Sequence, residues 1–403
     1  SSAMAGSSGL RLRLSTARFA HHPSTASSAT RCIALSSSTS PIHSSRSMSQ
    51  AFLIVSACGV ETCILPSAVF SNHTGADFHG FTFRDLTEDM PEIAAKWKKE
   101  HIAFDAIYTG YLGSRRQIAI VQEIMDTLLA PGGLRIVDPA MADNGALYTG
   151  FDLAFVEEMA KLCGGADYIL PNLTEACLLT GTEYREGLQS EAEIRGLLKK
   201  LAALGAKHVI LKGISYEEGR IGNVVYDSAS GDFRYDFTPR VPRSSHGTGD
   251  CFAAAFTGAM LRGKSAFEAT KLAARFVVAS IRATEGDSAH WYGVKFEKTL
   301  PLLTEALNVP TFTIEGKYVR DLETFYAEID RVLTDGTQKT GHNLSAFDDI
   351  LRGGFGKHAY GQRIHLYWKD FDVSRTALGD ETALRLIGII LDRESGHDCK
   401  LEF

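Results

Sequence analysis

Short apolar runs alternate along the chain with longer segments in which apolar residues recur every three or four positions. The short runs have the length and content of buried strands, at residues 105–109, 134–138, 168–170 and 208–211. The longer segments have helical spacing, at residues 117–129, 151–163 and 191–204. Strands that alternate with amphipathic helices form a mostly parallel sheet. The pattern therefore predicts an α/β fold with helices on both faces of the sheet.

Three interruptions of this pattern give the domain organisation. Residues 51–58 are apolar and short enough to be a buried strand or a helix face, and two apolar runs within residues 223–238 predict a β-hairpin. The alternation ends near Leu307, and after a short connector a new strand is expected at residues 311–314. We therefore expect a first domain over residues 51–307 and a second over residues 308–403.

The composition is that of an ordinary globular protein. The 403 residues are 44% hydrophobic and 22% charged, with a net charge of −6. General nucleic-acid or membrane-surface binders usually carry a basic excess, so this balance argues against both. No apolar run approaches the roughly 18 residues that span a bilayer. The seven cysteines are scattered without a C-x-x-C pair, which favours reduced thiols over disulfides or a zinc site.

Residues 1–50 differ from the rest of the chain in composition. They contain no Asp or Glu, and their charge comes from five arginines amid Ser, Ala and Thr. This composition is typical of an organelle transit peptide, but a segment without a fold has the same composition. The expected location is therefore the cytoplasm, or a plastid or mitochondrion if the segment is a transit peptide.

The sharpest motif is His-Gly-Thr-Gly-Asp at residues 246–250, followed by small apolar residues that predict a buried helix. Glycines at 247 and 249 permit a tight turn. The N–H groups at the start of a helix can hold a phosphate, and Asp250 in the first turn could take the proton from an attacking hydroxyl. A turn that only caps the helix is the alternative.

Two further polar clusters follow expected strands, at the edge where parallel sheets bind ligands. Asp138 and Asp143 could approach a metal–phosphate complex, since Mg²⁺ favours carboxylate and phosphate oxygens. A pair of Asx turns is the alternative. Asn172 and Glu175 face the same side of an expected first helical turn. They could hold metal-bound water and phosphate, form a capping box, or do both.

The order of these three clusters resembles that of the ribokinase superfamily. Upstream segments narrow the resemblance to the pyridoxamine/pyridoxal kinase family, at residues 59–66, 71–75, 80–87 and 105–113. The resemblance covers about residues 51–307 and implies ATP-dependent phosphorylation of the 5′-hydroxymethyl group of a vitamin B6 compound: pyridoxal, pyridoxine or pyridoxamine. It implies ATP and Mg²⁺ as cofactors and leaves a monovalent cation open. It also favours a homodimer formed through the kinase domain.

The resemblance implies roles for individual residues. It makes Asp250 the general base and the backbone amides of Gly247, Thr248 and Gly249 the anion hole. It assigns the ATP phosphates to Asp138, Asp143, Tyr148, Asn172, Glu175, Lys212 and Gly213, and the metal to Asp138 and Glu175. It places Thr74 and Tyr111 beside the vitamin ring.

The chain departs from the family at its start. The family begins with a core strand and a loop that helps to hold the vitamin ring, whereas the resemblance begins only near Ala51. Cys32–Leu35 is a weak candidate for that strand, followed by a serine loop. An absent strand would leave buried backbone groups without partners, at about 1–3 kcal/mol each. Against a total stability of roughly 5–15 kcal/mol that loss is serious, so an impaired kinase is an alternative.

Residues 311–403 resemble barstar, of the ribonuclease-inhibitor family, chiefly at residues 312–316, 341–351 and 364–369. The resemblance implies a small α/β domain that inserts acidic side chains of one helix into a basic nuclease site. Asp349 occupies the principal acidic position, whereas Ser345 and Asp348 replace an acidic and an aromatic residue. Because a lost charge weakens electrostatic matching, a domain with some other partner or none is the alternative to a basic protein partner.

Three hypotheses for function follow. The leading one is a vitamin B6 kinase with a small-molecule substrate and no nucleic-acid or membrane partner. The second is another ribokinase-like kinase, such as one for hydroxymethylpyrimidine. The third is an inactive kinase scaffold that presents the barstar-like domain as a binding module.

Overall fold

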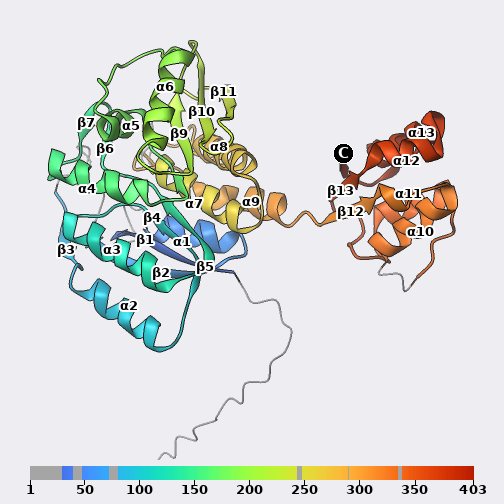
Figure 1. The fold of residues 1–403 in the computed structure, drawn as a ribbon, viewed down its shortest axis with the longest axis horizontal. Coiled ribbons are helices and arrows are strands. Elements are labelled where there is room, and N and C mark those ends of the chain that lie inside the picture. Colours follow the sequence, from blue (N-terminus) through green and yellow to red (C-terminus); the bar gives the residue numbers. More distant parts are fainter. Residues whose placement is uncertain (1–29, 40–47, 72–79, 243–246, 289, 335–337) are drawn as a thin grey trace, which may run out of the picture.

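The computed structural model describes residues 30–39, 48–71, 80–242, 247–288, 290–334 and 338–403 (Figure 1). The first domain is built on a nine-stranded sheet in the order β11-β10-β9-β8-β5-β4-β1-β2-β3. Its strands are β1 (Arg31–Thr39), β2 (Glu61–Phe70), β3 (Phe83–Asp85), β4 (Phe104–Thr109), β5 (Leu129–Val137), β8 (Tyr168–Ile169), β9 (His208–Ile214), β10 (Arg220–Asp227) and β11 (Phe233–Pro239). The six strands from β9 to β2 are parallel, and β3, β10 and β11 are antiparallel to their neighbours.

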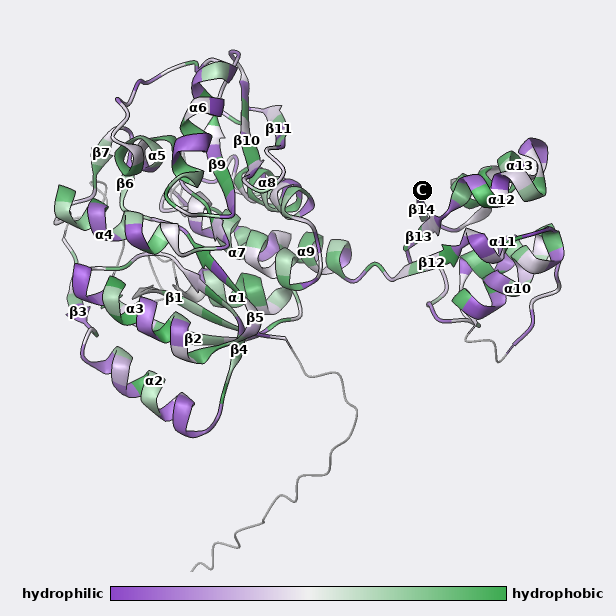
Figure 2. Cartoon of the chain, in the orientation of Figure 1, coloured by the Kyte–Doolittle hydropathy of each residue, from purple (hydrophilic) through white to green (hydrophobic). Residues whose placement is uncertain are grey.

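Helices cover both faces of this sheet, as the sequence predicts. They are α1 (Met48–Ala57), α2 (Asp89–Lys99), α3 (Arg115–Leu128), α4 (Leu153–Gly164), α5 (Leu173–Thr180), α6 (Glu191–Ala202), α7 (Thr248–Leu261), α8 (Ala266–Arg282) and α9 (Leu300–Leu307), with a 3₁₀ turn at Phe296–Thr299. One core cluster packs α2, α3, α4, α5 and α6 on one face, and a second packs α1, α7, α8 and α9 on the other. Figure 2 shows the sheet strands as largely hydrophobic, with hydrophilic residues along α2 and α6.

The first strand corrects the expected start of the domain. β1 lies between β4 and β2, where Ile33 is in register with both Ile107 and Cys63. Cys32–Leu35 is fully buried, and alternate residues of this run join the two opposite core clusters. The boundary expected at residue 51 is therefore too late, because residues 31–39 form an inner strand of the sheet. The backbone groups of β2 and β4 therefore have β1 as a hydrogen-bonding partner.

The second domain has its own core around a three-stranded parallel sheet of order β12-β13-β14. Its strands are β12 (Thr311–Glu315), β13 (Ile364–Lys369) and β14 (Cys399–Glu402). Its helices are α10 (Leu322–Leu333), α11 (Leu344–Arg352), α12 (Phe371–Leu378) and α13 (Asp380–Leu391), with 3₁₀ turns at Gly316–Tyr318 and Arg393–Ser395. This is the small α/β domain that the sequence predicts. Within the described ranges, no helix is long and apolar enough to cross a membrane.

Candidate active site

The carboxyl ends of the central strands bring most of the candidate residues together. Asp138 directly follows β5, and its backbone N–H donates to Thr109 O, the last residue of β4, at 2.9 Å. Asn172, just before α5, forms an isolated parallel bridge with Lys212 of β9. Gly213 follows with φ +74°, a left-handed conformation that glycine adopts readily. Three neighbouring strands thus deliver Asp138, Asn172 and Lys212 to one edge.

A buried ion pair forms the centre of the cluster. Lys212 Nζ donates to both carboxylate oxygens of Asp138 at 3.0 Å. The two side chains are only 12% and 5% exposed. Burial raises the pKa of Asp138 despite the neighbouring lysine. Burial favours neutral Lys212, yet Asp138 and Glu175 together raise the pKa of its ammonium, so the lysine stays charged.

Glu175 forms the predicted capping box and also holds the neighbouring loop. One carboxylate oxygen accepts from Asn172 N at 2.9 Å, and Asn172 Oδ1 accepts from Glu175 N in return. The other oxygen accepts from Met141 N at 3.1 Å. Burial, followed by the charge of Asp138, raises the pKa of Glu175 to about 7. The capping interpretation is therefore confirmed, and the same carboxylate faces the Asp138–Lys212 pair.

The loop after Asp138 folds back over this cluster. It contains a small hairpin, β6 (Ala142–Asp143) and β7 (Ala146–Leu147), and the start of α5 holds it at two more points. Asn172 Nδ2 donates to Ala142 O at 2.8 Å, and Gly145 N donates to Thr174 Oγ1 at 3.0 Å. Tyr148 follows this hairpin and is 43% exposed; partial burial, and then the carboxylates of Glu175 and Asp143, raise the pKa of its hydroxyl.

Asp250 reaches the same cluster from the other core layer. Gly247 (φ +77°) precedes α7, and no side chain caps this helix among the described residues. Thr248 and Gly249 begin the helix, with Asp250 in its first turn. Burial, then the charge of Asp138, raises the pKa of Asp250 to about 7, while Lys212 opposes the shift. Asp250, in the first turn of α7, therefore lies within electrostatic range of the Asp138–Lys212 pair.

An aromatic surface lies beside the cluster on the same edge of the sheet. The ring of Tyr111, in the loop after β4, meets Phe70 at the end of β2 edge-on at 5.8 Å between centroids. On its other side it meets Phe151 at 5.7 Å. The resemblance places Tyr111 and Thr74 beside the vitamin ring; Tyr111 lies in this aromatic surface, and Thr74 lies outside the described residues.

Two features of this surface were not predicted. The sequence pattern places Phe151 in a helix, whereas Phe151 lies in the loop before α4 and contacts Tyr111. Gln117, buried in α3, donates to Ser67 O and Thr87 Oγ1 at 2.9 Å and accepts from Gly113 N at 2.6 Å. It thereby ties the loop of Tyr111 to β2 and to the turn after β3. The available signal was a glutamine on the apolar face of an amphipathic helix.

The fit of the site to Mg²⁺ depends on its excess of carboxylates. Among the described residues, no group of three or more His, Cys, Asp and Glu side chains is arranged to hold a metal ion. Asp138 and Glu175 already accept hydrogen bonds, but an ionised carboxylate has about four lone-pair sites and keeps some capacity. With Asp250 they surround one lysine, so negative charge is in excess. These residues fit a hydrated Mg²⁺ that is shared with substrate phosphates.

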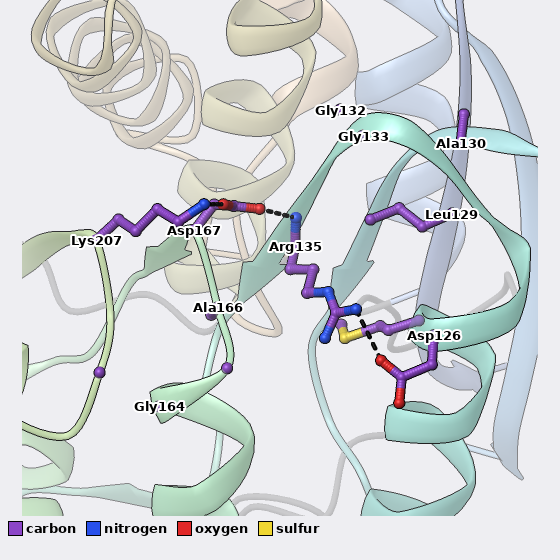
Figure 3. Close-up of a pocket in the computed structure, with 13 residues that line it drawn as sticks. Asp126, Leu129, Ala130, Gly132, Gly133, Arg135, Gly164, Ala166, Asp167 and Lys207 are labelled. Atoms are coloured by element: carbon purple, nitrogen blue, oxygen red, sulfur yellow. Dashed lines mark hydrogen bonds and ion pairs between the residues drawn. The ribbon is translucent and has the colours of Figure 1, made fainter.

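A hollow of about 510 Å³ lies at the opposite edge of the sheet, before β8 and β9 (Figure 3). There Asp167 accepts from Lys207 Nζ at 2.7 Å and from Arg135 N at 2.8 Å, and Arg135 Nη2 donates to Asp126 at 2.7 Å. None of the predicted site residues lines this hollow. Its charged groups are paired with one another, in contrast to the carboxylate excess at the carboxyl edge.

In the second domain, Asp349 lies on α11 with 58% of its side chain exposed. Arg352 Nη1 donates to Asp349 Oδ1 at 2.6 Å, and Nη2 donates to Asp348. Asp348 also accepts from His397 Nε2 at 3.2 Å. Asp348 is therefore largely enclosed by Arg352 and His397, and the exposed carboxylate of Asp349 is already paired with Arg352.

Known proteins resemble both domains. Residues 58–293 match the family described as phosphomethylpyrimidine kinase, and residues 309–399 match barstar, the barnase inhibitor. The hydroxymethylpyrimidine/phosphomethylpyrimidine kinase of Bacillus subtilis is 30% identical over 213 residues, which are 52% of this chain and 73% of that protein. The pyridoxal kinase of Granulibacter bethesdensis is 28% identical over 56% of this chain and 80% of that protein. The bifunctional thiamine-biosynthesis protein of Geobacter sulfurreducens is 29% identical, and this chain spans only 38% of its length.

Solved structures give the same result for the first domain. A phosphomethylpyrimidine kinase of Bacteroides thetaiotaomicron, crystallised with pyridoxal, is 36% identical with a TM-score of 0.64, over 68% of this chain and 96% of that one. The Staphylococcus aureus pyridoxal kinase with AMP-PCP is 25% identical with a TM-score of 0.54, over 64% and 89% of the two chains. The chain therefore belongs to the phosphomethylpyrimidine kinase family, which includes pyridoxal kinase relatives, and carries a barstar domain at residues 309–399.

Proposed function

We propose that the first domain transfers the γ-phosphoryl group of ATP to the 5′-hydroxymethyl group of pyridoxal, pyridoxine or pyridoxamine. The observation that carries this proposal is the position of Asp250. This carboxylate has a pKa of about 7 and lies within the charge field of Asp138 and Lys212, in the first turn of α7. Glu175, whose pKa is also about 7, lies in the same cluster.

Asp250 acts as the general base. A base works best when its pKa lies near the working pH, and such a group contributes roughly 10²–10⁴ in rate. As the alcohol oxygen bonds to the γ-phosphorus, its proton passes to the Asp250 carboxylate and the bond to the ADP oxygen breaks. The N–H groups at the start of α7 then face the oxygens of the moving phosphoryl group, where charge gathers.

The remaining cluster positions the phosphates. Lys212 supplies a fixed positive charge, because Asp138 and Glu175 keep it protonated. Asp138 and Glu175 would hold a hydrated Mg²⁺, which when bound neutralises phosphate charge. Asn172 and Glu175 also hold the loop of Asp143 and Tyr148 over the site. With these parts, positioning and electrostatics suffice, since phosphoryl transfer needs little covalent help.

The choice of a vitamin B6 substrate rests on two supports. The match to the Granulibacter pyridoxal kinase covers 80% of that protein. The 36% identical Bacteroides structure contains pyridoxal. Tyr111, flanked by Phe70 and Phe151, offers an aromatic surface for a flat ring. Hydroxymethylpyrimidine is the second candidate, favoured by the 30% identical Bacillus relative. The inactive-scaffold hypothesis loses its main support, because β1 fills its place in the sheet.

The assay that tests this proposal measures ATP-dependent phosphorylation of pyridoxal and of hydroxymethylpyrimidine by the full chain. We expect the specificity constant for pyridoxal to be the higher of the two and Asp250→Asn to remove the activity. Wild-type protein with no more activity than Asp250→Asn on either substrate would defeat the kinase proposal. A higher specificity constant for hydroxymethylpyrimidine would retain the mechanism and replace the substrate.

We also propose a homodimer formed through the first domain and a basic partner for the second. Phe81 and Phe83, beside and on edge strand β3, are 49% and 52% exposed, which suits an interface at this edge. Sedimentation of Phe83→Glu would give a smaller species than wild type if the edge forms the dimer.

Pull-downs with residues 308–403 and with Asp349→Ala test the basic partner. A cleavable transit peptide would have to end before Arg31, because β1 begins there.

A further inference from the structure

A row of four aromatic rings crosses the edge of the sheet beside the carboxylate cluster. Phe70 meets Tyr111 edge-on with centroids 5.8 Å apart, and Tyr111 meets Phe151 at 5.7 Å with 32° between ring planes. Phe151 stacks on Phe155 of α4 at 4.1 Å and 10°. The rings come from β2, the loop after β4, the loop before α4 and α4 itself. Phe151 therefore connects the ring of Tyr111 to the buried core.

The backbone on both sides of this contact is fixed. Tyr111 O accepts from Ser67 Oγ at 3.0 Å, and Gly113 N donates to buried Gln117. Phe151 N donates to Tyr148 O at 3.1 Å, across a turn in which Gly150 has φ +94°. With the backbones held, the remaining freedom of Tyr111 is rotation of its side chain. Phe70 and Phe151 limit that rotation from two sides.

We infer that Phe151 is a positioning residue for the acceptor ring: it fixes the angle of the Tyr111 ring against which a flat nitrogen heteroaromatic alcohol stacks. This inference rests on the proposed function only in placing the acceptor at Tyr111. Offset and tilted ring contacts depend on the angle between the planes, so a freely rotating Tyr111 would bind the same ligand less well. Phe151 needs no contact with the ligand for this role.

Loss of the Phe151 side chain should affect binding of the acceptor ring and leave nucleotide binding unchanged. The hydrogen bond from Phe151 to Tyr148 uses the backbone N–H, which every residue except proline has. Truncating the side chain at 151 therefore leaves the loop of Tyr148 over the phosphate side in place. Nucleotide binding should stay as in wild type while ring binding weakens. A purely structural role for Phe151 would weaken both.

The experiment is a double-mutant cycle read by binding, which does not depend on phosphoryl transfer. Pyridoxine and, separately, AMP-PNP are titrated into the full chain by calorimetry, for wild type, Phe151→Ala, Tyr111→Ala and the double variant. We expect Phe151→Ala to weaken pyridoxine binding about three- to tenfold, the effect of one aromatic contact. Phe151→Leu should restore only part of this loss. In the double variant the loss should equal that of Tyr111→Ala alone, because Phe151 acts through that ring.

A matched control is Phe233→Ala on β11. The rings of Phe233 and Tyr226 lie 4.5 Å apart with 31° between their planes, which is the same kind of pair. They belong to β11 and β10, at the end of the strand order far from β2. This variant should bind pyridoxine like wild type. Equal pyridoxine affinity in wild type and Phe151→Ala, additive losses in the double variant, or an equal loss of AMP-PNP binding would each overturn the inference while leaving the kinase proposal intact. Wild-type protein that binds AMP-PNP but no pyridoxine would overturn the ring site itself.

Discussion

The carboxylate cluster at the carboxyl edge of the first domain and the acids of α10 and α11 in the second domain are arranged in opposite ways. In the first, Asp138, Glu175 and Asp250 share Lys212, and two of the three have a pKa of about 7. In the second, the acids of α11 and those around His342 have partners within the domain. Arg352 bridges Asp348 and Asp349. Both ring nitrogens of His342 lie 2.7–2.8 Å from a carboxylate, one on Glu323 and one on Asp330.

This difference separates a reactive site from a stabilising network. Uncompensated buried charge lowers stability but leaves carboxylates ready to take protons and attract cations, as catalytic sites require. Carboxylates that are paired within the domain stabilise the fold and present less negative charge to a binding partner. The barstar domain therefore presents less negative potential on α11 than its acidic residues suggest, because Arg352 neutralises one charge of the pair. Each prediction below changes the charge balance at one of these two places.

Removing the proposed base should give the largest effect. Asp250→Asn keeps the size and position of the side chain but cannot accept the proton, so kcat should fall about 10²–10⁴-fold. Steady-state assays of ADP release with pyridoxal give the measurement. Binding of AMP-PNP should remain within a few-fold of wild type, which controls for misfolding. A variant that keeps more than half of the wild-type kcat would assign the base role elsewhere.

Removing Lys212 should destabilise the fold, because the buried carboxylates then lack a neighbouring positive charge. Lys212→Met leaves Asp138 buried without its cation, which typically costs about 3–5 kcal/mol of unfolding free energy. Urea denaturation followed by circular dichroism measures this loss. The double variant Asp138→Asn, Lys212→Met should recover most of it, because no buried charge is then left unpaired. If single and double variants are equally unstable, Lys212 contributes packing and not charge compensation.

The pH dependence of activity and of stability should run in opposite directions. The folded-state pKa of Asp250 is raised from its usual 3.8 to about 7. Its contribution to stability is therefore fully present below about pH 4 and is lost as the pH rises through 7. The specificity constant should rise over the upper part of the same range, because the base must be ionised.

The matched comparison for this pH effect is again Asp250→Asn. Its unfolding free energy should exceed that of wild type at pH 8, and the difference should vanish near pH 4. One unit of pKa difference corresponds to about 1.4 kcal/mol, and we expect at least that difference at pH 8. Denaturation curves at both pH values provide the test. A difference that does not change with pH would mean that the carboxylate titrates normally.

The sequence predicts the phosphate side of the site better than the ring side, for a physical reason. Asp138, Asn172, Lys212 and Asp250 each follow or end a short apolar strand or begin a helix, so local pattern and parallel topology bring them together. Phe151 and Gln117 act through contacts between residues from different elements, such as the contact of Phe151 with Tyr111. One sequence does not reveal such contacts. These contacts depend on the geometry of the loops, which the spacing of apolar residues along the sequence does not predict.

The first strand shows a different limit. Only Cys32–Leu35 of β1 is apolar, and three serines and a threonine complete the strand, so its local signal is weak. Its stability comes from neighbours: Cys32–Leu35 is buried between β2 and β4, with helices on both sides. Tertiary burial therefore decides the conformation where propensity does not. β2 was missed for the same reason, because Pro66 and Ser67 interrupt its apolar run.

The smallest predicted effect lies in the balanced network of the second domain. His342 immediately precedes the N-cap of α11, and its ring stacks on Tyr326 of α10. Hydrogen bonds to Asp330 and Glu323 raise the pKa of His342, since only the protonated ring donates to both. Its contribution is therefore present below its usual pKa of 6.5 and is lost as the pH rises through the raised value. For a largely solvent-screened group we expect about 0.5–1 kcal/mol.

Hydrogen exchange of peptides that cover α10 and α11 in the full chain measures this contribution locally. At pH 6, His342→Gln should exchange faster than wild type in these peptides, because the cation no longer joins the two carboxylates. At pH 9 the difference should be smaller, because the positive charge of His342 declines as the pH rises through its raised pKa. His358→Gln is the matched control, because burial lowers the pKa of that histidine. An exchange difference of the same size at pH 6 and pH 9 would assign His342 a packing role, and the charge balance of this domain would then rest on Arg352 and its two aspartates.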